Sequence, residues 1–502
     1  MISSRLLVAS YLGLLYRSKG QPEGKLARII LVVDEYHELF VGDQDGIASN
    51  QLLQLAQQGR SAGIHMLLAS QRFGAAGMMH QTAIFGNVHL RMAMKMTDSD
   101  RQALTEFGRR GKQLIMTCDL PGKIVINDEA GNDGEGANRV GKVAFIKPER
   151  IEELLQTLRN KARQNLSAKD LPMTVIFDGQ AQPNLIENPQ LHKILEQPRW
   201  MTPKEWQKLA RQSIYDGGLD RSDWFSAERP NVIWLGQEFS VRGQAMIILR
   251  RRLAENILII GANNAARYGM LAAILTSLAI NANPKMIQFI ILDRSMPETD
   301  WCTALPSVCK SVLKQPNFSA KLSRDGRHTG KILEFLLREL DKRSKQSEDT
   351  LLKLPSIFVM MTELERVDEL RRQDDGYGLT DSPLGQQLQR LYSEGSRLGI
   401  HLILSFSNLR SMISILDERR GLVNFRHRVA LQMSEDDSFT FVQSRDASRL
   451  QLDGDEPICG LYKDVENDKT VRFKPYSIES HIPWEEQLKE IGNRLVTWSK
   501  KS

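Results

Sequence analysis

The feature that most restricts the fold of this chain is an internal repeat. Residues 59–72 read GRSAGIHMLLASQR and residues 395–408 read GSRLGIHLILSFSN, so both contain G-x-x-x-G-I-H followed by an apolar run. Two further segments repeat in the same order, with residues 29–35 matching residues 356–363 and residues 87–96 matching residues 424–433. Three anchors at nearly constant separation indicate two copies of one folding module.

Each anchor is a short apolar run bounded by glycine or polar residues, which is typical of a strand buried on both faces of a sheet. Helical stretches at residues 50–58 and 384–392 lie between the anchors, and Ser382 with Pro383 predicts the start of the second of these helices. The alternation of strand and helix predicts an α/β fold: two tandem modules with mostly parallel sheets and helices on both faces.

The repeat and the local composition divide the chain into four parts. We expect a first module over residues 1–148, a linker with a small helical packing element over residues 149–230, a second module over residues 231–480 and a C-terminal helix over residues 481–502. The first module is predicted to lack the N-terminal part of its fold, because few residues precede its first anchor.

Composition restricts the class of protein less strongly. Of the 502 residues, 41% are hydrophobic, as in packed globular domains, and 67 basic against 61 acidic residues leave a net charge of +6, which does not by itself indicate nucleic-acid binding. The four cysteines lack C-x-x-C spacing, which predicts a reduced, cytoplasmic protein. The apolar residues 6–15 are too short to span a bilayer as a helix and predict a buried helix instead.

An acidic pair, Asp34 and Glu35, follows the apolar run at residues 29–33. Hydrolysis of ATP in P-loop enzymes uses one carboxylate near Mg²⁺ and another that orients the attacking water, both at the end of a central strand. The alternative is that the pair only ends a strand, since strand ends are often acidic. The G-x-x-x-G-I-H segment that follows favours the catalytic interpretation.

These motifs together resemble a known family. VVDE at residues 32–35, GRSAGIH at residues 59–65 and LASQR at residues 68–72 look like the Walker B, helix-end and sensor-strand motifs of the FtsK/SpoIIIE family. The resemblance covers residues 25–145 and, more weakly, residues 231–475. Members of that family are ring-forming RecA-like ATPases that pump double-stranded DNA, and their EssC/EccC relatives drive protein export.

The resemblance implies roles for individual residues. Asp34 would bind Mg²⁺ through water, Glu35 would activate the attacking water, and Gln71 would sense the γ-phosphate of ATP; for Gln71 the alternative is a buried polar residue satisfied by backbone groups. It also implies an arginine that acts in trans on a neighbouring subunit, for which Arg60 and Arg91 are candidates. Arg91 is repeated as Arg428, which equally suits a structural salt bridge.

The departures from the family concern the phosphate-binding loop. No G-x-x-x-x-G-K-[ST] motif occurs in the chain, so any Walker A loop serving Asp34 must come from elsewhere. In the second module the corresponding strand ends at Gly261, but Ala266, Arg267 and Tyr268 stand where glycine, lysine and a small hydroxyl residue belong. A phenol is too large to coordinate Mg²⁺ as serine does. The helix is expected to begin at Gly269.

The acidic motif of the second module is also altered, with Thr362 in place of the aspartate, although Glu363 remains. We therefore predict a degenerate second nucleotide site around Gly261, Arg267 and Glu363, which binds nucleotide weakly or not at all. Several basic groups, such as residues 109–112, are predicted to be solvated helix ends rather than contacts to phosphate.

Three functions agree with these patterns. The main prediction is part of an ATP-driven, ring-forming DNA translocase that uses Mg²⁺; the alternatives are an EssC/EccC-like export ATPase with a protein substrate and an inactive scaffold. Two tandem modules with a degenerate second site are more typical of an export ATPase than of a DNA translocase with a single motor domain. The isolated chain is predicted to be inactive as an ATPase.

Overall fold

A computed structural model describes residues 28–40, 43, 46–71, 78–104, 106–165, 181–200, 231–239, 243–314, 317–374, 376, 378–450 and 457–500. The helix expected at residues 6–15 lies outside these ranges. The chain divides into two compact units, Met1–Ile176 and Phe177–Ser502, and the division falls within the predicted linker. Within the described residues, no helix is long and apolar enough to cross a membrane.

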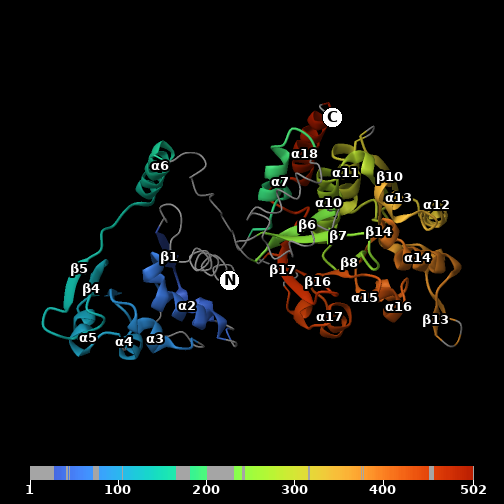
Figure 1. The fold of residues 1–502 in the computed structure, drawn as a ribbon. Helices are drawn as coiled ribbons and strands as arrows, with labels where there is room; N and C mark the ends of the chain where they lie inside the picture. The colour runs from blue at the N-terminus through green and yellow to red at the C-terminus, as the bar shows by residue number, and fades with distance from the viewer. Residues whose placement is uncertain are drawn as a thin grey trace. The chain divides into compact units, whose positions relative to one another are not determined.

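The second unit is built on a ten-stranded sheet among the described residues, in the order β10-β9-β11-β14-β8-β15-β16-β17-β6-β7 (Figure 1). Its strands are β6 (Asn231–Glu238), β7 (Gln244–Leu249), β8 (Ile257–Ile260), β9 (Ile287–Leu292), β10 (Ser319–Ser323), β11 (Ser356–Thr362), β14 (Ile400–Phe406), β15 (His427–Ala430), β16 (Gly460–Asp464) and β17 (Lys469–Pro475). The strands from β10 to β15 pair in parallel and the remaining pairs are antiparallel. The predicted α/β class with a mostly parallel sheet is thus confirmed for this unit.

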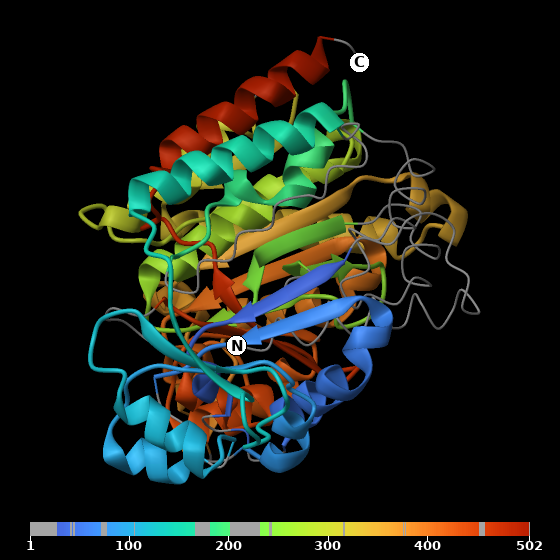
Figure 2. The same cartoon turned by 90° about the vertical axis from the view of Figure 1, so that its left-hand side faces the viewer.

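Helices cover both faces of this sheet. The helices of the second unit are α7 (Pro189–Leu195), α10 (Asn264–Asn281), α11 (Ala304–Ser311), α12 (Thr329–Arg343), α13 (Glu348–Lys353), α14 (Pro383–Glu394), α15 (Leu409–Ile413), α16 (Glu418–Leu422), α17 (Glu435–Val442) and α18 (Trp484–Ser499). Side chains of α7, α10, α11 and α18 share one buried apolar cluster, and those of α12, α14, α15 and α17 share another. Figure 2 shows α18, in red, outside the strands on the face that α7, α10 and α11 also cover.

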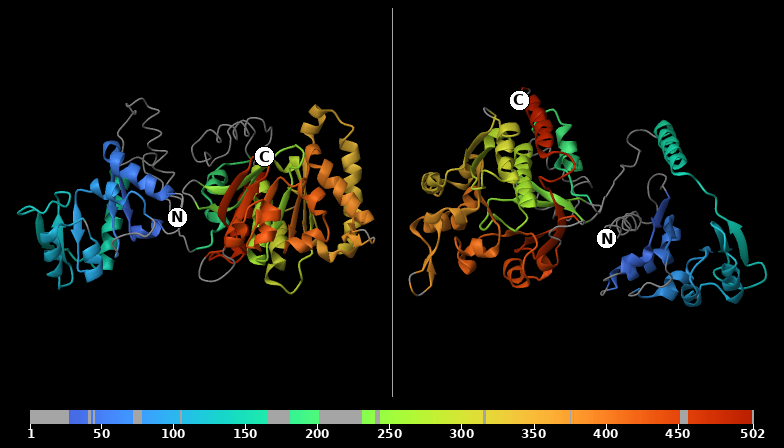
Figure 3. Two further views of the ribbon diagram at one scale, coloured as in Figure 1. Left: turned by 90° about the horizontal axis from the view of Figure 1, so that it is seen from below. Right: turned by 180° about the vertical axis from the view of Figure 1, so that it is seen from behind.

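The first unit contains two small sheets among its described residues (Figure 3). Its strands are β1 (Ile29–Val33), β2 (Ile64–Leu68), β3 (Arg91–Ala93), β4 (Lys123–Asn127) and β5 (Asn138–Lys142), and its helices are α2 (Ile47–Gln58), α3 (Gln81–Gly86), α4 (Asp98–Ala103), α5 (Arg109–Met116) and α6 (Pro148–Asn165). β1 pairs with β2 in parallel, whereas β3, β4 and β5 form a separate antiparallel sheet. Two small buried clusters hold these parts together.

The structure reproduces the sequence repeat in its backbone. β1 pairs with β2 so that Ile29 is opposite Ile64, and β11 pairs with β14 so that Ile357 is opposite Ile400, as the alignment of the two copies requires. The chain turns sharply at the glutamate of each acidic motif, because both Glu35 and Glu363 have left-handed backbone conformations, with φ of 48° and 47°. Such a φ is uncommon for a residue with a side chain.

Candidate functional site

The acidic pair of the first unit lies at the carboxyl end of β1. Val33 is the last paired residue of the strand, and the chain continues through Asp34 and Glu35 into a short 3₁₀ helix, η1 (Tyr36–Phe40). The amide of Tyr36 donates to the carbonyl of Ala69 over 3.0 Å, which ties this turn to the end of β2. The two acidic side chains therefore stand at the edge where parallel strands place catalytic groups.

The two carboxylates have different surroundings. Asp34 is exposed, and its only hydrogen bond among the described residues comes from the amide of Glu35 at 3.0 Å. Glu35 Oε2 accepts hydrogen bonds from Ser70 Oγ at 3.4 Å and from the amide of Gln71 at 3.3 Å, and lies 3.2 Å from His37 Nδ1. Asp34 is thus open to a hydrated cation, while Glu35 is held in one orientation.

Gln71 and Arg60 are both exposed. Gln71 approaches Glu35 through its backbone amide, so the structure brings these two predicted site residues together. The alternative of a buried polar Gln71 does not apply, because the residue is at the surface. Arg60 lies on the 3₁₀ helix η2 (Gly59–Ala62), which precedes β2.

Arg91 is held inside its own unit. Its guanidinium donates to the carbonyl oxygens of Phe85, Val88 and Glu106 over 3.0, 3.1 and 2.7 Å. Arg428 makes the corresponding three bonds in the second unit, to the carbonyl oxygens of residues 422, 425 and 441 over 2.8, 3.1 and 2.8 Å. A guanidinium fixed by three carbonyls is not free to reach a neighbouring subunit, so this geometry favours the structural alternative for Arg91.

The corresponding site of the second unit has no phosphate-binding loop. Only three residues separate β8 from α10, and Asn263 caps the helix by accepting a hydrogen bond from the amide of Ala266 at 2.9 Å. The predicted start of this helix at Gly269 is wrong. The helix begins at Asn264, because Asn263 caps it there. A Cβ on Gly261 would lie 2.4 Å from Leu431 Cβ, so side-chain packing closes in on the turn.

Arg267 and Glu363 fill the place where a nucleotide phosphate would bind. Both are buried, and Arg267 Nη2 lies 3.1 Å from Glu363 Oε1. Arg267 also donates to Ser405 Oγ, and Glu363 Oε2 forms a second ion pair with Arg366, whose Nε lies 2.9 Å away. A buried cation and a buried anion that satisfy each other leave no charge for a triphosphate to neutralise.

A second chain of hydrogen bonds takes the place of the metal site. Tyr268 Oη bonds to Thr362 Oγ1 at 3.3 Å, and Thr362 donates in turn to Asp293 Oδ1 at 3.2 Å. Burial raises the pKa of Tyr268 far above its usual range, so the phenol remains a neutral donor. ATP and Mg²⁺ therefore do not fit this site, whereas the exposed Asp34 beside a fixed Glu35 suits a hydrated Mg²⁺.

Sequence reasoning missed Asp293, Ser405 and Asn263 in this site. Asp293 follows β9 just as Asp34 follows β1, so an acidic residue after an apolar run was the available signal. Asn263 carried the N-cap signal, which was not used. Among the described residues, no group of three His, Cys, Asp or Glu side chains is placed to hold a metal ion.

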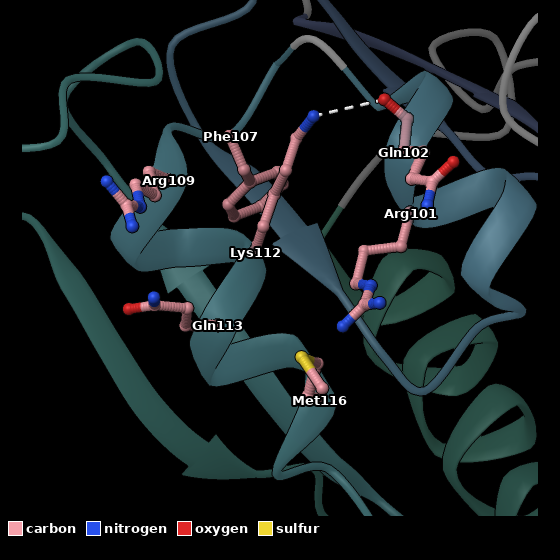
Figure 4. A pocket seen from close by; sticks show the side chains of 7 residues that line it. All are labelled: Arg101, Gln102, Phe107, Arg109, Lys112, Gln113 and Met116. Carbon is pink, nitrogen blue, oxygen red and sulfur yellow. Dashed lines mark hydrogen bonds between the residues drawn. The ribbon is translucent and has the colours of Figure 1, made fainter.

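An open depression of about 440 Å³ lies in the first unit, apart from the acidic pair (Figure 4). Its lining includes Arg101, Arg109 and Lys112, and no acidic residue. Lys112 Nζ donates to the carbonyl of Gln102 at 3.1 Å, and Arg101 pairs with Asp98 at 2.9 Å. The nearby start of α5 is already occupied by the carboxylate of Asp133, which accepts from the amides of residues 110 and 111. The basic group is thus largely engaged within its own unit.

The sheet order defines the class: an α/β protein with a large, mostly parallel sheet covered by helices, as in RecA-like domains. The sequence model of the FtsK/SpoIIIE family matches residues 218–325, which include β6 to β10, so the second unit carries a domain of that family. The repeated segments of the second unit, residues 356–433, follow this matched range in the sequence.

The particular relatives are proteins of type VII secretion. The chain is 22% identical over 448 residues to the type VII secretion system protein EssC of Staphylococcus aureus, a match covering 83% of this chain and 28% of EssC. It is 30% identical over 115 residues to the ESX secretion system protein EccC of Geobacillus thermodenitrificans, covering 23% of this chain and 7% of that protein.

One solved structure supports the fold. The cytoplasmic domain of the type VII secretion ATPase EccC of Thermomonospora curvata is similar with a TM-score of 0.53 and 16% identity, over 98% of this chain and 52% of that chain. The chain therefore spans about half, or less, of the length of the relatives it matches. The predicted resemblance to the FtsK/SpoIIIE family and its EssC/EccC relatives is confirmed.

Proposed function

We propose that this chain is part of a type VII secretion ATPase of the EssC/EccC kind. The main sequence prediction, a DNA translocase, is not supported, because the relatives that match both units are secretion proteins. The predicted alternative, protein export, agrees better with those relatives. Double-stranded DNA is accordingly not retained as the partner.

The observation that supports this proposal is a contrast between the two units: the strand-end site of the first unit is open, and that of the second is filled by side chains. Asp34 and Glu35 keep an exposed, ATPase-type strand end, whereas Arg267 and Glu363 neutralise each other in the second unit. A protein with this arrangement hydrolyses ATP in the first unit only, and uses the second as a folded module for binding or regulation.

In the first unit, each residue at the strand end has a separate role in ATP hydrolysis. When ATP is bound with Mg²⁺, the metal neutralises phosphate charge and polarises the phosphoryl group. Asp34 would hold the hydrated ion and Glu35 would take a proton from the attacking water, while Ser70 and the Gln71 amide keep the Glu35 carboxylate in position. The same proposal includes a Walker A loop from outside the described residues and ring-like self-association, with Arg60 as the arginine that acts in trans. It also includes a helical protein substrate and a cytoplasmic location.

The test uses the full-length protein in its own cells. Glu35→Gln should abolish the release of exported proteins into the medium, and Glu135→Gln, which removes an exposed carboxylate elsewhere in the first unit, should leave release unchanged. ATP turnover by the purified full-length protein should not respond to duplex DNA. Salt-dependent stimulation of turnover by DNA, with export intact in Glu35→Gln cells, would contradict the proposal.

A further inference from the structure

One polar side chain at the strand end of the first unit takes no part in the proposed hydrolysis of ATP. His37 lies on η1, two residues after Glu35, and its side chain is 20% exposed, less than those of Glu35 and Glu38, which are 32% and 57% exposed. Contacts of a shielded ring are weakened less by solvent than those of an exposed surface pair. The ring is therefore placed to act on its neighbours.

The backbone of η1 brings this ring between the two glutamates. The amide of Glu38 donates to the carbonyl of Glu35 over 3.0 Å, and a 3₁₀ turn places side chains three positions apart on the same side. Tyr36 and Phe40 of the same turn are buried in an apolar cluster, where the ring of Tyr36 lies 5.8 Å from that of Phe85. The buried residues of the turn thus hold its polar side chains in position.

Each ring nitrogen of His37 lies beside one carboxylate. Nδ1 is 3.2 Å from Glu35 Oε2, and Nε2 is 3.1 Å from Glu38 Oε1. An ionised carboxylate only accepts hydrogen bonds, so each contact requires a hydrogen on the nitrogen concerned. A ring with a hydrogen on both nitrogens satisfies both contacts and bridges the two glutamates.

Nδ1 also belongs to a group of polar atoms around one oxygen of Glu35. It lies 2.8 Å from Ser70 Oγ, and Ser70 Oγ and the amide of Gln71 lie 3.4 and 3.3 Å from Glu35 Oε2. Three groups therefore surround Oε2, whereas no described residue bonds to Oε1 of the same carboxylate. A carboxylate fixed by one oxygen presents the other in a constant direction, which a base that must reach one water requires.

The second unit carries different side chains at the corresponding positions. Its sequence from Glu363 reads ELER, where the first unit reads EYHE, so Glu365 stands in place of His37. Burial raises the pKa of Glu365, and Glu363 is paired instead with Arg366, whose Nε lies 2.9 Å from its Oε2. A guanidinium keeps its charge at physiological pH, so it neutralises its partner permanently. A histidine thus contacts the glutamate of the open site, and an arginine contacts the glutamate of the filled site.

We propose that His37 is a positioning residue, which holds Glu35 through Nδ1 and is itself anchored on Glu38 through Nε2. This role rests on the proposed function, because it assumes that Glu35 is the base for the attacking water. The bridge between the two glutamates depends only on contacts within the first unit. The role is not a catalytic one, since His37 acts on the water only through Glu35.

The first test detects the bridge without nucleotide. In the 502-residue chain labelled with ¹⁵N-histidine, NMR should give nine ring signals, and the one lost in His37→Asn belongs to His37. Glu35→Gln and Glu38→Gln should each shift that signal. Asp34→Asn, which changes a nearby carboxylate that does not contact the ring, should shift it less. If either glutamate variant shifts the signal no more than Asp34→Asn does, the inference is overturned.

The second test separates the two ends of the ring in the full-length protein. The amide nitrogen of asparagine takes the place of Nδ1 as a donor, and that of glutamine takes the place of Nε2. His37→Asn should therefore keep kcat for ATP within about threefold, whereas His37→Gln and His37→Ala should lower kcat about tenfold with KM unchanged. Glu135→Gln, at an exposed position elsewhere in the first unit, is the control and should change neither value.

The melting temperature of each variant separates positioning from packing. Equal losses of kcat in His37→Asn and His37→Ala, or losses that follow the melting temperatures, would overturn the positioning role. A His37 signal that responds to both glutamates, together with normal export in Glu35→Gln cells, would support the bridge while contradicting the proposed function, so the two fail separately.

Discussion

Arg267 Nη2 lies 3.1 Å from Glu363 Oε1, and both side chains are buried at the carboxyl edge of the large sheet. In an active enzyme of this class these two positions hold a lysine that contacts phosphate and the glutamate that activates water. Here the two residues contact each other. The two opposite charges form an internal ion pair that needs no ligand.

We expect removal of the two partners of this ion pair to lower the stability of the second unit by different amounts. Glu363→Gln should lower the free energy of unfolding of the second unit by about 3 kcal/mol, because the buried Arg267 loses its counter-charge. Arg267→Met should cost less, because Glu363 keeps its bond to Arg366. Urea denaturation followed by tryptophan fluorescence measures both.

Two further variants make that comparison specific to the buried pair. The double variant Arg267→Met with Glu363→Gln should be more stable than Glu363→Gln alone, because the uncompensated buried cation is removed. Arg338→Gln, which removes one side of an exposed pair with Glu334, should change stability by less than about 0.5 kcal/mol. Equal costs for Glu363→Gln and Arg338→Gln would contradict the assignment.

The filled second site predicts that nucleotide does not stabilise the second unit. Binding at a hundred times the dissociation constant would add about 2.7 kcal/mol, which a thermal melt detects. We expect no change in the melting of the second unit with millimolar Mg-ATP. A saturable shift that persists in the Asp34→Asn, Glu35→Gln double variant would locate binding at the second site and show this expectation to be wrong.

The bonds of Arg91 separate a structural from a catalytic role. Arg91→Lys should destabilise the first unit by roughly 2 kcal/mol, because one ammonium cannot reach three carbonyl oxygens that diverge around a guanidinium. Arg60→Lys, at an exposed position, is the matched control and should leave the melting temperature unchanged. An Arg91→Lys protein with normal melting but reduced ATP turnover in the full-length protein would reverse this assignment.

The buried His401 predicts a pH dependence. Burial lowers its pKa to about 4, although the hydrogen bond to the Glu255 carbonyl opposes the shift. An unfolded histidine titrates near pH 6.5, so between about pH 6.5 and 4 the unfolded state binds the extra proton and stability falls as the pH falls. The expected slope is up to about 1.4 kcal/mol per pH unit.

His401→Gln should flatten this slope in urea unfolding curves measured from pH 7 to 4.5. His65→Gln, the exposed counterpart in the first unit, should leave the slope unchanged. If both variants keep the full slope, the proton uptake belongs to other groups of the chain.

The sequence was sufficient to predict the α/β class, and it also placed Asp34 and Glu35 at the end of a strand, because a short apolar run followed by polar residues is a local signal. It did not predict how the degenerate site is filled, since contacts such as Tyr268 to Thr362 join residues far apart in sequence. The sequence also left the role of Arg91 undecided, because a repeated arginine gives the same sequence pattern whether it binds backbone carbonyls or contacts a neighbouring subunit. The distances from its guanidinium to three carbonyl oxygens favour the structural role.

The three-residue turn between β8 and α10 has a consequence for any attempt to restore activity to the second unit. Replacing Ala266, Arg267 and Tyr268 with glycine, lysine and threonine would restore the motif's letters, but residues 264–266 would still lie in the helix that Asn263 caps instead of in an open loop. Reactivation therefore requires the loss of the Asn263 cap as well as new side chains at the three motif positions.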